Sequence, residues 1–144
     1  MDATGFHTEY VYGEKGKMNT KAAEAYENLK KASLDSNTGI KEVSALQAQQ
    51  YANKGYTVVT ALDENGHKKN ESGHIATVRP NTLFPSEVLF NGPTIANVGI
   101  KNGIMSTSDS NAYGKLYKNG NVHFFVDSNQ SSLILGTDGI AKQL

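Results

Sequence analysis

One helical pattern followed by two β-runs is the feature that most restricts how this chain can fold. Residues 43–54 have the spacing of a surface helix, and a glycine follows as its stop signal. Residues 56–62 are almost all apolar or β-branched, which predicts a strand. After a polar loop, Gly73 and His74 lead into a second β-run at residues 75–78. A helix and two neighbouring strands of this kind are typical of domains in which helices pack on a sheet.

The segment before this pattern predicts another helix. Apolar side chains recur there at the spacing of one buried helical face, at Ala22, Ala25, Tyr26, Leu29 and Ala32. Asn19 or Thr20 can cap this helix, which we expect to end near Ser33. Residues 1–17 predict an irregular arm with one short strand at residues 9–12.

The segment after residue 80 predicts more strands. Strand patterns recur at residues 86–90, 94–100, 121–126 and 133–135. Residues 102–114 are rich in Gly, Ser, Asn and Asp, which predicts an irregular loop. Asn119 and Gly120 predict a tight turn that leads by a hairpin into the strand after it. The whole pattern predicts an α+β fold with N-terminal helices packed on a mostly antiparallel sheet.

The composition excludes several classes of function. With 144 residues, the chain is expected to form one domain that spans residues 1–144. Its 14 basic and 14 acidic residues cancel and form no dense basic run, so nucleic acid is not an expected partner. No apolar run has the length of a membrane helix, and residues 1–5 do not begin a signal peptide. We expect a cytosolic protein, or one that leaves the cell without such a signal or after losing it.

Metal, disulfide and cofactor chemistry have no support in the sequence. The chain has no cysteine, which excludes disulfides and thiolate metal sites. Paired His and Glu spacings of metal hydrolases are absent, and Glu71, Asp109 and Asp127 are scattered along the chain. We therefore expect no metal and no cofactor.

Of the four histidines, only one stands in a suggestive context. His74 follows a glycine at the start of a β-run, where substrate can approach the imidazole closely. His67 lies in a polar loop, and His7 has no recognisable partner. His123 also has none, and its alternation with Val122 and Phe124 predicts an outward position.

The motif around His74 is similar to one found in a known family. Residues 52–58 read Ala-Asn-Lys-Gly-Tyr-Thr-Val, and residues 73–78 read Gly-His-Ile-Ala-Thr-Val. This pair of stretches resembles the NlpC-type papain-like cysteine peptidases and amidases. It is most similar to the peptidoglycan amidase effectors of type VI secretion and to phage-type cell-wall hydrolases. The resemblance covers residues 47–99 and is thin outside them.

The resemblance implies a catalytic site of three residues. His74 would act as base and acid, and Asn97 on the next strand would orient the imidazole. Ser72 and Gly73 would lie beside the substrate. The family's cysteine is followed by apolar residues three, four and seven positions later, a rule that Ala22 meets. An alternative reading leaves Asn97 as an ordinary polar strand residue.

The nucleophile of the family is therefore missing, with Ala22 at its expected position. Three explanations remain open: a cysteine replaced to inactivate the protein, a natural pseudoenzyme, or a core alanine on a scaffold similar only in fold. Thr20 is more plausible as a helix cap than as a nucleophile. Ser72 neighbours His74 in the sequence, but we do not expect it to serve as the nucleophile either.

The resemblance implies an amidase or endopeptidase that acts on the peptides of bacterial peptidoglycan. Without its cysteine the chain would bind these peptides and not cleave them. A location at the bacterial cell envelope or periplasm and a cognate immunity or inhibitor protein would follow. Two alternatives remain, a non-catalytic binding module and an inhibitor or immunity protein. In the binding module, a groove would be lined by tyrosines, namely Tyr10, Tyr12, Tyr113 and Tyr117.

Overall fold

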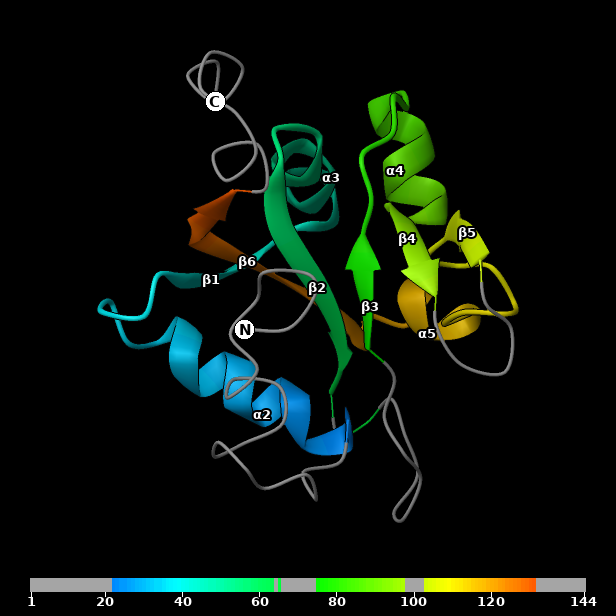
Figure 1. Ribbon diagram of the computed structural model, residues 1–144. Coiled ribbons are helices and arrows are strands. Elements are labelled where there is room, and N and C mark those ends of the chain that lie inside the picture. The colour runs from blue at the N-terminus through cyan, green and yellow to red at the C-terminus, as the bar shows by residue number, and fades with distance from the viewer. Residues whose placement is uncertain (1–21, 64, 66–74, 98–102, 132–144) are drawn as a thin grey trace.

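The structure, a computed structural model, describes residues 22–63, 65, 75–97 and 103–131. Within these residues four helices accompany one open sheet of six strands, in the order β1-β6-β2-β3-β4-β5 (Figure 1). Each pair of neighbouring strands is antiparallel, which confirms the predicted α+β class and antiparallel sheet. The elements are α2 (Ala22–Ser33), β1 (Ile40–Val43), α3 (Ala45–Asn53), β2 (Tyr56–Leu62), β3 (Ile75–Val78), α4 (Pro85–Asn91), β4 (Thr94–Asn97), β5 (Gly103–Ser106), α5 (Lys115–Lys118) and β6 (Val122–Ser131).

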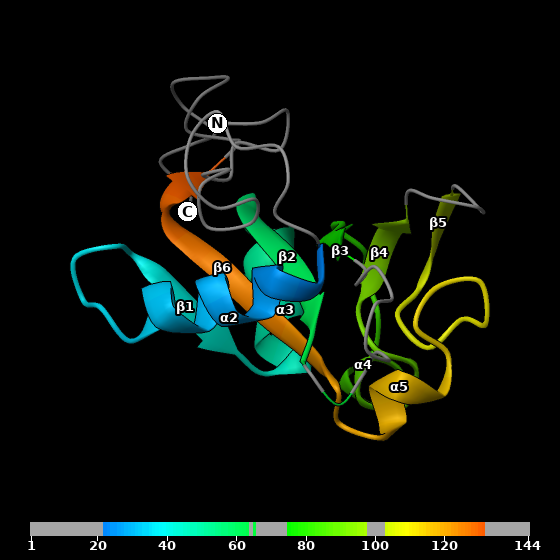
Figure 2. The same ribbon diagram turned by 90° about the horizontal axis from the view of Figure 1, so that it is seen from below.

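The two faces of the sheet carry separate apolar cores. Along β2, Val59 and Ala61 pack with the buried face of α2, whereas Val58 and Leu62 pack with α3. Both views place α2 at the β1–β6–β2 side of the sheet and α4 and α5 at the β4–β5 side (Figures 1 and 2). The strand predicted at residues 56–62 is therefore the central β2, and its continuous apolar run serves both cores.

The second predicted helix begins later than its sequence pattern indicated. Residues 40–43 form β1, which the sequence did not predict, and α3 starts only at Ala45. Ser44 caps it: its Oγ accepts a hydrogen bond from the Gln47 backbone N–H at 3.2 Å, and the Gln47 side chain accepts one from the Ser44 N–H at 3.0 Å. At the other end, Gly55 has a φ of 93° and is the predicted stop signal.

Residues 86–90, predicted as a strand, form most of α4 instead. Pro85 occupies the first helical turn, where its fixed φ suits a helix and its missing N–H costs nothing. The Glu87 side chain accepts a hydrogen bond from the Phe84 N–H at 3.2 Å. These local signals outweigh a strand-like pattern of side chains that is only a few residues long. Within α4, Val88 is the only buried residue.

Two other expectations for the C-terminal half were wrong. The predicted loop at residues 102–114 contains the edge strand β5 before a run of turns. The turn at Asn119 and Gly120 precedes β6 as expected, but it closes no hairpin, because α5 precedes it and β6 pairs with β1 and β2. A turn signal specifies local backbone and leaves the strand's partner open. The strands expected at residues 9–12 and 133–135 lie outside the described residues.

A buried polar pair anchors the turns after β5. Tyr113 is only 4% exposed, and its hydroxyl is hydrogen-bonded to Thr60 Oγ on β2. That oxygen also accepts a hydrogen bond from the Ala76 N–H at 2.9 Å. Burial raises the pKa of Tyr113 well above its ordinary value, although the Thr60 hydrogen bond acts in the opposite direction. Tyr113 is therefore a core residue and not the groove residue that we predicted.

Candidate functional site

The residues of the predicted catalytic site fall at the limits of the described chain. Ala22 is the first residue of α2 and Asn97 is the last residue of β4, and their side chains are outside the described part. Ser72, Gly73 and His74 also lie outside it, immediately before β3. The distances among these side chains therefore stay predictions.

The elements that carry these positions do come together. Ile75, the first residue of β3, packs against the cluster that contains Ala25 and Leu29 of α2. Both views show the N-terminal end of α2 close to the start of β3 (Figures 1 and 2). On the other side of β3, Thr77 pairs with Ala96 of β4. The start of α2, the start of β3 and the end of β4 thus lie at one end of the sheet.

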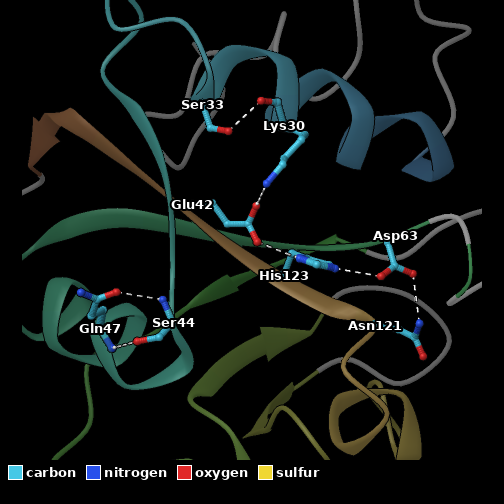
Figure 3. A network of polar contacts seen from close by, with 8 residues as sticks. All are labelled: Lys30, Ser33, Glu42, Ser44, Gln47, Asp63, Asn121 and His123. Atoms are coloured by element: carbon cyan, nitrogen blue, oxygen red, sulfur yellow. Dashed lines mark hydrogen bonds and ion pairs between the residues drawn. The ribbon is translucent and has the colours of Figure 1, made fainter.

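A second polar site, which the sequence did not predict, surrounds His123 on β6. Its Nδ1 lies 2.9 Å from Glu42 Oε2, and its Nε2 lies 2.8 Å from Asp63 Oδ2 (Figure 3). Our expectation of an outward histidine without a partner was wrong. The partners stand 81 and 60 residues away in the chain, so no local pattern could reveal them.

Further contacts extend this site across four elements. Lys30 of α2 forms an ion pair with Glu42 of β1 at 2.7 Å, and the ring of Tyr26 lies 4.6 Å from the His123 ring, centroid to centroid. At the far end, the Asn121 side chain donates a hydrogen bond to Asp63 at 3.1 Å. We call the chain Lys30–Glu42–His123–Asp63 the histidine clamp, because it joins α2, β1 and β6 to the end of β2 (Figure 3).

The charges of the histidine clamp shift the pKa of its acidic groups. Burial acts to raise the pKa of Glu42, but the hydrogen bonds from Lys30 and His123 outweigh it and hold that pKa below its ordinary value. For Asp63, burial likewise acts to raise the pKa, and the hydrogen bonds from His123 and Asn121 lower it further than burial raises it. The hydrogen bond to Glu42 raises the pKa of Lys30. The clamp therefore keeps its carboxylates charged.

This geometry does not suit His123 to general-base catalysis. Its Nδ1 and its Nε2 each lie within hydrogen-bond distance of a carboxylate oxygen, of Glu42 and of Asp63 respectively. These contacts occupy the two nitrogens through which an imidazole would exchange a proton with a substrate. Among the described residues no group of His, Asp and Glu side chains is arranged to hold a metal ion. The histidine clamp is a structural link between elements.

A hollow with a volume of about 470 Å³ lies beside the histidine clamp. It is lined by the end of β1, the end of α4, α5 and the start of β6. Its polar side chains already have partners: Tyr117 donates to the Val88 carbonyl at 3.0 Å, and Lys118 lies 4.1 Å above the Phe90 ring. Of the tyrosines expected in a groove, Tyr117 lines this hollow, and Tyr10 and Tyr12 lie outside the described residues.

Comparisons with known proteins leave the family open. No protein-family model matches the chain, and a search of curated proteins found no match. None of the helices in the described ranges is long and apolar enough to cross a membrane.

Proposed function

We propose that the chain is an NlpC-type papain-like domain for the peptides of bacterial peptidoglycan, in a form that binds and does not cleave. The observation that carries the proposal is that Ile75, directly after the Gly73-His74 motif, packs against the apolar cluster to which α2 contributes Ala25 and Leu29. A helix start beside the strand that follows a histidine is the arrangement that cysteine–histidine catalysis needs. The absence of cysteine explains why the proposed form lacks turnover.

The catalytic form would carry a cysteine at position 22. Its thiolate would be favoured by the positive end of the α2 dipole and would attack the carbonyl carbon of a peptide bond. His74 would take the thiol proton and give it to the leaving amine as the C–N bond breaks, and water would then hydrolyse the thioester. Asn97 would orient the imidazole, and backbone N–H groups at the helix start would stabilise the oxyanion.

The alternation along β3 sets one condition for this site. Ile75 packs on the α2 face, whereas Ala76 and Val78 belong to the core on the opposite face. Regular strand geometry continued back by one residue would turn position 74 away from α2. Pairing of positions 22 and 74 thus requires the backbone to leave that geometry between positions 74 and 75.

The experiment is gain of activity in Ala22→Cys, with Ala23→Cys as the matched control one position along the same helix. We expect the position 22 thiol to react with iodoacetamide near neutral pH faster than the position 23 thiol. We also expect it to cut purified muropeptides, as measured by mass spectrometry. His74→Ala in the Ala22→Cys background should abolish the cleavage, and Asn97→Ala should reduce it less.

Binding of the same muropeptides by the unaltered chain separates the two parts of the proposal. Binding without cleavage, together with activity of Ala22→Cys, supports the complete site. Binding with two equally unreactive thiols would leave a peptide-binding module, which is the alternative that the missing cysteine favours. Absence of binding in a calorimetric titration would overturn the proposed function. Action at the cell envelope and an immunity partner are parts of the same proposal.

A further inference from the structure

The two edge strands of the sheet differ in how well they are protected against pairing with a strand of another chain. Among the described strands, β1 and β5 each pair on one side only. β1 carries Lys41 and Glu42, and charged residues on an edge strand discourage pairing with other chains. β5 has the sequence Gly-Ile-Met-Ser, with neither a charge nor a proline. The β5 edge therefore lacks the charged residues and the proline that often prevent a further strand from adding, although the strand is short.

The hydrogen bonds around β5 show which backbone groups face that edge. The Thr94 carbonyl accepts from the Arg79 N–H at 2.8 Å, so Thr94 bonds toward β3. Bonding alternates along an antiparallel pair, so Ile95 bonds toward β5 and its partner Met105 bonds toward β4. The N–H and C=O of the intervening Ile104 consequently point to the outer edge.

The side chain at the centre of this edge strand is apolar and exposed. Ile104 is 67% exposed, although it is a large apolar residue of a kind usually buried. An added strand would cover part of this side chain.

We propose that β5 pairs with β5 of a second copy of this chain, with Ile104 opposite Ile104 of that copy. In this antiparallel register the N–H of each Ile104 donates to the C=O of the other, and the two side chains lie side by side. The Ser106 carbonyl already accepts a hydrogen bond from the Asp109 N–H at 3.1 Å. A pairing centred on Ile104 is therefore more favourable than one centred on Ser106. A net charge of zero means that two copies do not repel each other overall.

The contact is small, because β5 has only four residues. It belongs to the low end of specific interfaces, below about 1,200 Å² of total buried surface. The dimer is therefore reversible and depends on protein concentration. It does not depend on the peptidoglycan proposal, since none of the three proposed catalytic positions, 22, 74 and 97, contributes to it.

Sedimentation velocity across a concentration series tests the dimer. The unaltered chain is expected to shift from monomer to dimer as its concentration rises. Ile104→Lys places two like charges directly opposite each other and should weaken the dimer at least about tenfold. Ile104→Val should keep it, and Leu34→Lys, at a residue that is 77% exposed elsewhere, should leave it unchanged.

Cross-linking tests the register, because the chain has no cysteine of its own. Directly opposite residues in a hydrogen-bonded antiparallel pair have Cα atoms about 5.5 Å apart. This lies inside the range of about 4.4–6.8 Å in which disulfides form. Ile104→Cys should form a covalent dimer under mild oxidation much faster than Leu34→Cys. A chain that sediments as a monomer at every concentration, with equal slow cross-linking of both variants, would overturn the proposal.

Discussion

His123 and Asp63 are joined by a 2.8 Å contact between Nε2 and Oδ2, although 60 residues separate them in the chain. The contact holds the start of β6 to the end of β2, the same end of the sheet at which β3 begins. Together with the Glu42 contact, it makes His123 the common partner of two carboxylates. The stability of this end of the sheet should therefore depend on that one imidazole.

Replacement of His123 by Ala should destabilise the fold by about 1–3 kcal/mol, because two partly buried carboxylates lose their shared hydrogen-bond donor. The Tyr26 ring would also lose its neighbour. Urea unfolding followed by circular dichroism measures the change. Lys31→Ala, at an exposed lysine of α2, is the control and should be neutral within experimental error. Equal stability of the His123 variant and the control would show that the histidine clamp contributes nothing.

The lowered pKa values of Glu42 and Asp63 predict the pH dependence of stability. A carboxyl group whose pKa is lower in the folded state adds stability above its unfolded pKa, and that stability is lost as the pH falls through the folded pKa. The unfolded values are about 4.3 for Glu and about 3.9 for Asp. The contribution of the clamp should thus be present near neutral pH and disappear upon acidification below about pH 4.

Unfolding free energies measured in urea between neutral and acidic pH test this dependence. Glu42→Gln and Asp63→Asn should each flatten the acidic side of the profile, because the replaced group no longer titrates. Glu27→Gln, at an exposed glutamate of α2, provides the comparison. Unchanged profiles in both clamp variants would contradict the assignment.

Thr60 and Tyr113 should contribute unequally to stability. Thr60→Val keeps the side-chain shape but removes two hydrogen bonds, the one with the Tyr113 hydroxyl and the one from the Ala76 N–H. Loss of a buried hydrogen bond costs about 1–3 kcal/mol. Tyr113→Phe removes one partner and leaves the bond between Thr60 and Ala76 intact, so it should cost less. Thermal unfolding of the two variants measures the order, and the reverse order would refute this reading of the pair.

Gln49 of α3 holds the region where β3 and β4 separate. Its side chain is 3% exposed, donates to the Arg79 carbonyl at 2.9 Å and accepts from the Thr94 N–H at 2.9 Å. Gln49→Met keeps the length of the side chain and removes these two bonds and a third, to Asn53, which should cost roughly 2 kcal/mol or more. Gln50→Met, at the exposed neighbouring position, is the matched control. Hydrogen exchange at Thr94 should accelerate only in the first variant.

Local patterns were sufficient where a segment has a strong periodicity of its own. The helix of residues 22–33, the strand of residues 56–62 and the stop at Gly55 were all predicted. In each, the side-chain spacing or a backbone requirement acts over neighbouring residues only. The segment of residues 86–90 is too short to show a reliable side-chain periodicity. Pro85 and Glu87 at the start of α4 favour a helix there.

Tertiary structure alone decided which distant segments meet. β1 and β5 exist as strands because β6 and β4 supply their partners, and no signal in four residues specifies a partner. The same holds for His123, whose two carboxylates come from other strands, and for Gln49, whose partners are backbone groups of β3 and β4. The sequence alone determined the motif at Gly73 and His74, and the fold packed Ile75 after it against the apolar cluster that includes Ala25 and Leu29 of α2. Hydrogen bonds and side-chain packing act through space, so contacts of this kind are decided only once the chain has folded.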